Sequence, residues 1–260
     1  MVKRKRFEWL TLGFMFFSAV IFLFFLLPIV NVIIQNPISV LVETIMDKEV
    51  QASIFMSFLS ATITTIITVM LGTPLAYLLA KKEFREKSFI DSLIDLPVLI
   101  PHTVAGIALL TILAPNTFIG RPLSELGIRF LDTVFGIVAA QTFVSAPLYI
   151  KTVKEVFADV DPSLEKAART LGASPSKVFA KVDLPLAERG MLTGAILCWA
   201  RAISEFGAVI ILAYYPYTAP VLIFVRFVSE GLAASRPIAA WLMMLTFAIF
   251  ACLKALQREH

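Results

Sequence analysis

Residues 9–34 read WLTLGFMFFSAVIFLFFLLPIVNVII, a run that contains no charged side chain. About 20 consecutive apolar residues are enough for an α-helix to cross the hydrocarbon core of a bilayer, and this run is longer. The four basic residues at positions 3–6 resemble the start of a secretory signal peptide, but the apolar region of such a signal spans only ~7–15 residues. The sequence therefore predicts an uncleaved first membrane helix that faces lipid.

The composition of the whole chain indicates the same environment. Of the 260 residues, 58% are hydrophobic, only 16% are charged and 22 are phenylalanine. A soluble domain of this length needs more charge to cover its surface. The small net charge of +4 gives no reason to expect a nucleic-acid partner. Cys198 and Cys252 lie in apolar segments, where we expect small buried side chains rather than metal or redox ligands.

Hydropathy predicts about six membrane-spanning helices, and hence a single all-α, polytopic membrane domain over residues 1–260. The apolar segments are too long for the strands of a barrel and show no alternation. The second segment is rich in Ser, Thr and Gly, which let helices pack closely in lipid, so we expect it in the middle of the bundle. The six segments are residues 9–34, 54–80, 89–113, 134–156, 191–215 and 238–256.

The basic residues separate the connections into two sides. They gather before the first segment, between the second and third, between the fourth and fifth, and after the sixth. Arg201 lies inside the fifth segment, and the opposite connections hold only Lys48, Arg121, Arg129, Arg226 and Arg236. Because cytoplasmic loops are enriched in Lys and Arg, we expect a multi-pass protein of a prokaryotic inner membrane with both termini in the cytoplasm.

The connection at residues 158–188 is the longest on the basic side and carries helix-capping signals. Asp161 and Ser174 are each followed by proline, which predicts two helix starts. Gly172 predicts the stop between them, since glycine adopts the left-handed conformation at little cost. We expect two short helices that meet at an elbow with a basic rim. This elbow is either a docking surface for a cytoplasmic partner or an ordinary solvated loop.

The elbow contains KAARTLGASPSKVFAKVDLP at residues 166–185, which resembles the coupling motif of ABC importer permeases. That motif reads Glu-Ala-Ala, three residues, Gly, nine residues, then Ile-x-Leu-Pro. Lys166 stands where the motif has glutamate, and Glu165 precedes it by one place. We expect the second short helix to end at Leu184-Pro185. The matching positions are Ala167, Ala168, Gly172, Leu184 and Pro185, with Val182 in place of isoleucine.

The resemblance extends over most of the chain. The stretches GTPLAYLLAKKEF (72–84), DLPVLIPHTVAGIALL (95–110) and WARAISEFGAVIILAYYP (199–216) are similar to permeases of the molybdate, tungstate and sulfate branch, nearest to the archaeal molybdate/tungstate type. The resemblance implies a type I importer permease. It also implies that a separate ATPase docks on residues 158–188, with Glu165 and Lys166 among the coupling residues.

The same resemblance implies the partners. They are a second copy of this chain, two cytoplasmic ATPase subunits and an extracytoplasmic oxyanion-binding protein, in contact with membrane lipid. The sequence holds no GxxxxGK(S/T) phosphate loop, so we expect ATP and Mg²⁺ on the ATPase. This chain is expected to be a transport subunit without catalytic residues, cofactor or metal.

In this family the gate involves the third and fifth spans, which carry the candidate path or gate residues. Arg201 and Glu205 are four positions apart and share a helix face, and an ionisable pair within a membrane is a functional candidate. The pair is either structural or brings Arg201 to the anion, and His102 is either a packing residue or part of the path. We expect Asp91 and Asp95 to be solvated or to cap helices. The path candidates are Pro101, His102, Thr103, Arg201, Ser204, Glu205 and Gly207.

Two other functions are compatible with a polytopic chain. A permease of the same branch could carry sulfate or thiosulfate instead of tungstate or molybdate. An ion-coupled secondary transporter would have acidic residues at mid-membrane and broken helices in two repeated halves. Glu205 is the only acidic residue deep in a predicted span, and the sequence has no visible repeat. The importer permease is therefore the better interpretation.

Overall fold

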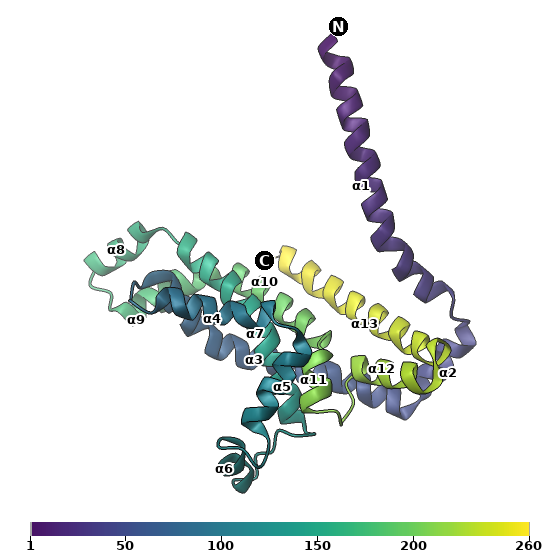
Figure 1. The fold of residues 1–260 in the computed structure, drawn as a ribbon. Helices are drawn as coiled ribbons and strands as arrows, with labels where there is room; N and C mark the ends of the chain where they lie inside the picture. Colours follow the sequence, from purple (N-terminus) through teal and green to yellow (C-terminus); the bar gives the residue numbers. More distant parts are fainter. Residues whose placement is uncertain (1, 260) are drawn as a thin grey trace.

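The computed structural model describes residues 2–259, and over that range the chain folds into helices without any strand (Figure 1). The predicted all-α fold class is therefore confirmed. The side chains of residues 2–8, 254 and 256–259 are not described, so the basic residues predicted to mark the termini lie outside the described side chains. The helices are α1 (Val2–Ile34), α2 (Ile38–Met46), α3 (Lys48–Lys81), α4 (Lys87–Leu99), α5 (His102–Leu113), α6 (Gly120–Glu125), α7 (Val134–Asp159), α8 (Pro162–Thr170), α9 (Pro175–Val178), the π-helix η1 (Phe179–Asp183), α10 (Leu184–Ile203), α11 (Gly207–Leu212), α12 (Ala219–Glu230) and α13 (Leu232–Glu259).

Four of the predicted spans are single helices that are long and apolar enough to cross a membrane. They correspond to the first, second, fourth and sixth predicted segments, and α4 and α5 together give a fifth candidate if that bent pair counts as one span. The four helical stretches are Trp9–Ile34, Lys48–Lys81, Val134–Asp159 and Leu232–Leu253.

The third predicted span is not one straight helix. α4 and α5 meet at an angle of 115°. Ile100 between them has an extended backbone, with φ −82° and ψ 149°. The ring of Pro101 disfavours a helical conformation for the residue before it, which explains why the first helix ends here and a new one begins.

The fifth predicted span, residues 191–215, is also interrupted, and its prediction as one helix was wrong. α10 ends at Ile203 and α11 begins at Gly207, so three residues leave the helical path. α10 begins earlier than predicted, at Leu184, and the extra residues include Glu188 and Arg189. The break is stabilised by contacts such as the hydrogen bond from the N–H of Ala208 to Glu205, and a hydropathy window does not detect such contacts.

The centre of the fold is a bundle of α3, α7 and α10. Thr64 of α3 contacts Gln141 of α7 (Oγ1–Oε1, 3.2 Å), and further along both helices the hydroxyl of Thr73 lies 2.7 Å from that of Tyr149. The two helices therefore run in the same direction. Ser57, Ser60, Ala61, Thr64 and Thr68 of α3 are all buried, which confirms that the second predicted span lies in the middle of the bundle.

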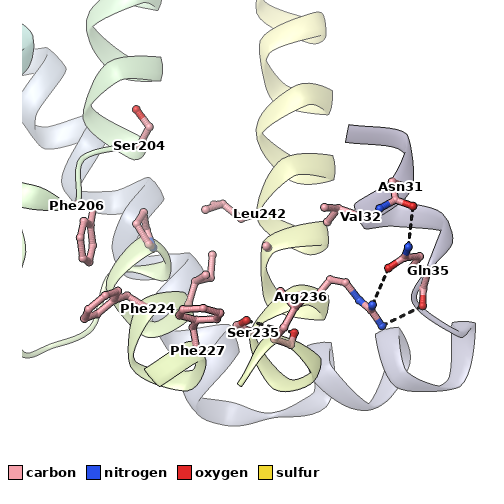
Figure 2. A pocket seen from close by; sticks show the side chains of 14 residues that line it. Asn31, Val32, Gln35, Ser204, Phe206, Phe224, Phe227, Ser235, Arg236 and Leu242 are labelled. Carbon is pink, nitrogen blue, oxygen red and sulfur yellow. Dashed lines mark hydrogen bonds between the residues drawn. The ribbon is translucent and has the colours of Figure 1, made fainter. Parts of the chain in front are cut away.

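By contrast, α1 projects away from the rest of the molecule (Figure 1). None of its apolar window is buried within the chain, as predicted for a lipid-facing helix. Figure 2 shows what holds its base. Arg236 of α13 donates to the side chain of Gln35 (2.8 Å) and to its backbone oxygen (3.1 Å). It also donates to the side chain of Asn36 (3.2 Å). This clasp borders an apolar cavity of about 620 Å³ between α1, α12 and α13.

Two predictions for single side chains need correction. Asp91 and Asp95 of α4 were expected to be solvated or to cap helices, but they form ion pairs with Lys154 and Lys151 of α7. The pairs join residues that are far apart in the sequence, so no local pattern could indicate them. Cys198 is buried as expected, whereas Cys252 is exposed because it lies on the outer side of α13, which the rest of the chain does not cover.

The short helix α11 packs directly against α5, and Gly106 allows this contact. A Cβ atom at Gly106 would lie 2.8 Å from the Cβ of Ile211 and 2.9 Å from the backbone oxygen of Ala208. Because backbone atoms cannot move aside as a flexible side chain can, any larger residue at this position has to push the two helices apart.

We predict that Gly106→Ala lowers the stability of the purified chain by about 1–3 kcal/mol, the usual cost of overpacking. The measurement is the midpoint of thermal unfolding in detergent. Gly13→Ala is the matched control, because Gly13 is also helical but has nothing within 4 Å of the added Cβ. Equal midpoints for the two variants would show that the contact between α5 and α11 is not tight.

Candidate functional site

The breaks in the third and fifth predicted spans lie next to each other and border one cavity of about 710 Å³. Six of the seven predicted path residues line this cavity, and the seventh, Glu205, lies beneath its wall with 1% of its surface exposed. The lining residues are Leu99, Ile100, Pro101, His102, Thr103, Arg201, Ser204, Phe206 and Gly207.

Local sequence explains how the two breaks bring these residues together. Pro101 is the N-cap of α5, so His102 is the first residue of that helix. On the other side, Ser204 is the C-cap of α10, and its hydroxyl donates back to the backbone oxygen of Arg201 (3.0 Å). Gly207 then allows the close approach, because a Cβ atom there would lie 2.7 Å from the Cβ of His102.

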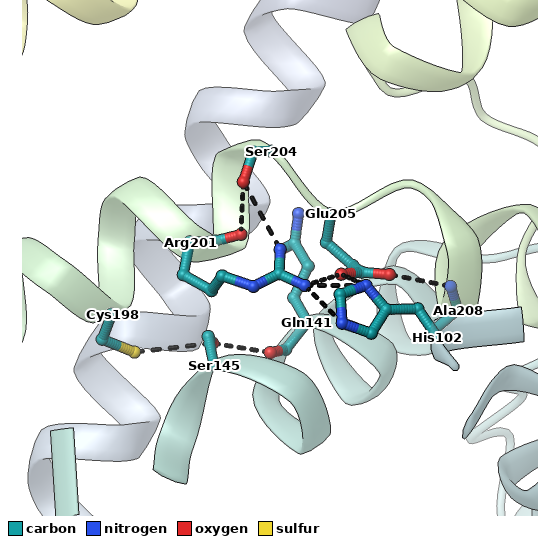
Figure 3. A network of polar contacts seen from close by, with 8 residues as sticks. All are labelled: His102, Gln141, Ser145, Cys198, Arg201, Ser204, Glu205 and Ala208. Atoms are coloured by element: carbon teal, nitrogen blue, oxygen red, sulfur yellow. Dashed lines mark hydrogen bonds and ion pairs between the residues drawn. The ribbon is translucent and has the colours of Figure 1, made fainter. Parts of the chain in front are cut away.

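Arg201 connects the two breaks through one nitrogen of its guanidinium group (Figure 3). Its Nη2 atom lies 2.7 Å from Oε2 of Glu205, and 2.8 Å and 2.9 Å from the two ring nitrogens of His102. Since an arginine N–H can only donate, the histidine nitrogen must accept. The guanidinium therefore ties α5 to the end of α10.

Glu205 is held by a second, independent hydrogen bond. Its Oε1 atom accepts from the backbone N–H of Ala208 at 2.8 Å, which is one of the amides without an intrahelical partner at the start of α11. Both carboxylate oxygens are thus paired although the side chain is buried. Removing one partner of a buried ion pair typically costs about 3–5 kcal/mol, so this arrangement fixes the local structure.

Arg201, Glu205 and His102 form a cluster at the two helix breaks. The sequence predicted these residues as candidates but did not predict most of the contacts that they make. The ion pair of Arg201 and Glu205 is present, and His102 is hydrogen-bonded to it. Sequence reasoning missed the backbone of Ala208 and the cavity wall formed by Phe206. Glu205 was itself a signal, because negatively charged side chains are favourable at the start of a helix.

A second group of predicted residues forms the elbow between α7 and α10. Asp161 caps α8 by accepting from the backbone N–H of Ser163 (2.8 Å), which holds the pKa of this carboxyl below its usual value. Ser174 caps α9, and Gly172 between the two helices has φ +84°. The predicted caps and the glycine stop are therefore confirmed.

The predicted end of the second short helix at Leu184-Pro185 was wrong. α9 continues through η1 into α10, and Pro185 lies in the first turn of α10. The N–H of Leu184 bonds to the oxygen of Phe179 in the wider π-type pattern. A proline has no N–H and crowds the preceding turn, and the wider turn just before it accommodates this without ending the helix.

Glu165 faces the body of its own chain. Its carboxylate pairs with Lys81 at the end of α3 (2.7 Å), and both side chains are at least 85% buried, with 15% and 11% of their surfaces exposed. Next to them the buried Asp183 accepts from the hydroxyl of Tyr77 (3.0 Å), and burial, with the nearby Glu165, raises the pKa of the Asp183 carboxyl. These two contacts attach the elbow to α3.

The other predicted coupling residues leave an exposed surface on α8. Lys166 and Ala167 are exposed and Ala168 is half-buried, while the apolar side chains of Leu164 and Leu171 are 46% and 88% exposed. Of the two residues further along, Leu184 is half-buried and Pro185 is exposed. An apolar and basic surface without cover in the single chain is typical of a contact surface.

Comparisons with known proteins show the family of the chain. Residues 72–258 match the family described as the inner membrane component of binding-protein-dependent transport systems. The molybdate/tungstate transport system permease protein WtpB of Pyrococcus abyssi is 44% identical over 230 residues, which cover 88% of each chain. Its counterpart in Pyrococcus furiosus is 41% identical over 249 residues, which cover 95% of each chain.

The more distant relatives match a smaller part of the sequence, and the similar solved structures share the fold at low sequence identity. Probable sulfate transport permeases are 32% to 37% identical and cover 65% to 77% of this chain. A chain of a bacterial ABC transporter involved in the import of the acidic polysaccharide alginate has the same fold, with a TM-score of 0.78, 16% identity, and coverage of 99% of this chain and 98% of that one.

Proposed function

The chain belongs to the family of inner membrane components of binding-protein-dependent transport systems, and we propose that it is the permease subunit of an ATP-driven importer of tungstate and molybdate. The observation that carries this proposal is identity above 40% along nearly the whole chain to molybdate/tungstate permeases. The chain itself is a transport subunit of an ABC importer and not an enzyme.

The elbow supports a specific mode of coupling. Two copies of the chain would form the pathway, two cytoplasmic ATPase subunits carrying ATP and Mg²⁺ would grip the exposed surface of α8, and an external binding protein would deliver the oxyanion. Closure of the ATPase dimer on ATP would then swing the helices between inward-facing and outward-facing states, because ATP binds one state more tightly than the other.

The cluster at the two helix breaks supports a gate on this pathway. His102 lies on α5 and Arg201 on α10, so a relative movement of these helices must stretch or break the contacts of the guanidinium. We infer that Pro101, Thr103, Ser204 and Gly207 line the path next to this gate. Strong anion binding belongs in the external protein, since a deep site here would slow release.

Sulfate or thiosulfate is the second candidate substrate, favoured by the more distant likeness to probable sulfate permeases. We predict that uptake of radiolabelled tungstate, with the matching binding protein, is inhibited by unlabelled molybdate or tungstate at concentrations at least about tenfold below those needed for sulfate. Equal inhibition by sulfate would favour a sulfate permease.

The orientation follows from the positive-inside rule, with the elbow and both termini in the cytoplasm. We predict that cysteines placed at the exposed positions Lys48 and Glu125 react with an impermeant maleimide in intact cells, and that one at Ser176 reacts only after permeabilisation. Cys252 must first be replaced by serine because it is exposed, whereas the buried Cys198 can remain. Labelling at Ser176 in sealed cells would reverse the topology.

The coupling role of the elbow has a test with a matched control. Gly172, with φ +84°, and Gly127, with φ +85°, both have nothing within 4 Å of an added Cβ, so a β-branched residue at either position introduces the same kind of backbone strain with space around its Cβ. A left-handed conformation costs a non-glycine residue roughly 1–2 kcal/mol. We predict that Gly172→Val abolishes copurification of the ATPase and uptake at an unchanged membrane level, while Gly127→Val retains both.

The measurements are the amount of chain in the membrane, the amount of attached ATPase and the rate of ATP-driven uptake. Normal uptake by Gly172→Val with the ATPase attached would show that the elbow is not the coupling element. Loss of the ATPase in both variants would attribute the effect to general destabilisation.

A further inference from the structure

Arg201 is the residue with a permanent positive charge among the described residues that line the 710 Å³ cavity. Its side chain is 23% exposed, so part of the guanidinium group faces the open space. An oxyanion in this cavity is attracted by that charge. The start of α5, with Pro101, His102 and Thr103 in the cavity wall, adds the positive end of a helix dipole.

The five N–H donors of Arg201 are used unequally. The Nη2 atom is engaged by Glu205 and His102. The Nη1 atom makes one long contact, 3.4 Å to the hydroxyl of Ser204. Among the described residues 2–259, this is the one hydrogen bond that Nη1 makes. The cavity side of the guanidinium therefore has donors to spare.

Ser204 provides a second donor at the same place. Its side chain is exposed, and its hydroxyl donates to the backbone oxygen of Arg201 at 3.0 Å. A hydroxyl can rotate toward a new acceptor. Nη1 and this hydroxyl could thus bind two oxygens of one tetrahedral anion.

Glu205 keeps this attraction small. Its carboxylate is buried and is anchored by the N–H of Ala208 as well as by Arg201, so it cannot swing away when an anion arrives. It therefore remains beside the guanidinium as a fixed counter-charge. A dianion at Nη1 is attracted by Arg201 and repelled by Glu205, which lies 2.7 Å from Nη2 of the same group, so the repulsion offsets part of the attraction.

We propose that the cavity is a passing site for a tetrahedral oxyanion, in which Nη1 of Arg201 and the hydroxyl of Ser204 bind the anion, and Glu205 is a fixed counter-charge that keeps the affinity low. This inference rests on the proposed function, because it assigns a role to the same gate. Glu205 prevents the permease from becoming a trap that competes with the external binding protein.

The test measures tungstate retained by the purified complex of permease and ATPase without the binding protein, by equilibrium dialysis and elemental analysis for tungsten. Glu205→Gln keeps an oxygen for the N–H of Ala208 but removes the charge. We expect Glu205→Gln to raise the affinity for tungstate at least about tenfold over the wild type. We expect Glu205→Gln with Arg201→Gln to return to the wild-type level.

Glu49→Gln is the matched control, because Glu49 also pairs with an arginine, Arg226 at 2.8 Å, and lies outside the lining of the cavity. It should leave tungstate retention unchanged. No gain in Glu205→Gln, or a gain that survives the loss of Arg201, would overturn the inference. An equal gain in Glu49→Gln would overturn it as well, because a general change in charge would then explain the effect.

A second measurement covers the case in which Glu205→Gln does not assemble. The chain has two histidines, His102 and His260, so ¹³C-histidine labelling of the wild-type permease gives two ring signals, and His102→Asn identifies one of them. Tungstate should shift the signal of His102 and not that of His260. Absence of a shift at concentrations that support uptake would overturn the inference.

Different results would overturn the proposed function and the passing site. If the wild-type complex takes up tungstate with its binding protein but Glu205→Gln shows no gain, the proposed function stands and the passing site is wrong. If the wild-type complex with attached ATPase takes up no tungstate, the proposed substrate itself is wrong.

Discussion

A backbone inside a bilayer has no water to bond to, so each interruption of a membrane helix needs partners from the protein itself. This constraint shapes the centre of the molecule. The break after Ile203 is stable because Glu205 accepts from Ala208, one of the free amides in the first turn of α11, and Ser204 bonds back to Arg201. The break at Pro101 is stable because α5 starts against Gly207. Ser204 and Gly207, which take part in these contacts, also line the cavity.

The elbow and this cluster are the two ends of one continuous element. α9, η1 and α10 follow each other without leaving helical geometry from Pro175 to Ile203, a length of roughly 40 Å. Two contacts attach the near end to α3, those of Glu165 with Lys81 and of Asp183 with Tyr77. At the far end Arg201 reaches across to α5. This continuous helix therefore connects the elbow to the cavity that Arg201 lines, and the wider turns of the π-helix lie near its elbow end.

The sequence predicted what depends on neighbouring residues and missed what depends on distant ones. The apolar run at 9–34, the caps at Asp161 and Ser174 and the positive φ of Gly172 are local features, and all are present. The 115° bend at Pro101 is not local, since a proline also fits a mild kink, and the contact of Gly106 with Ala208 selects the sharp one. Likewise, no residue near Glu165 in the sequence indicates that its carboxylate forms an ion pair with Lys81.

The isolated position of α1 has a consequence for the response of the protein to its membrane. Its apolar stretch has 26 residues, no residue of its apolar window is buried within the chain, and polar contacts from Arg236 hold it at one end. At about 1.5 Å per residue the stretch is longer than the ~30 Å hydrocarbon core of a typical bilayer, so hydrophobic mismatch has to be relieved by tilting or by local thickening of the lipid. A thinner membrane therefore favours a steeper tilt of α1 about the Arg236 clasp, with little change in the packed bundle.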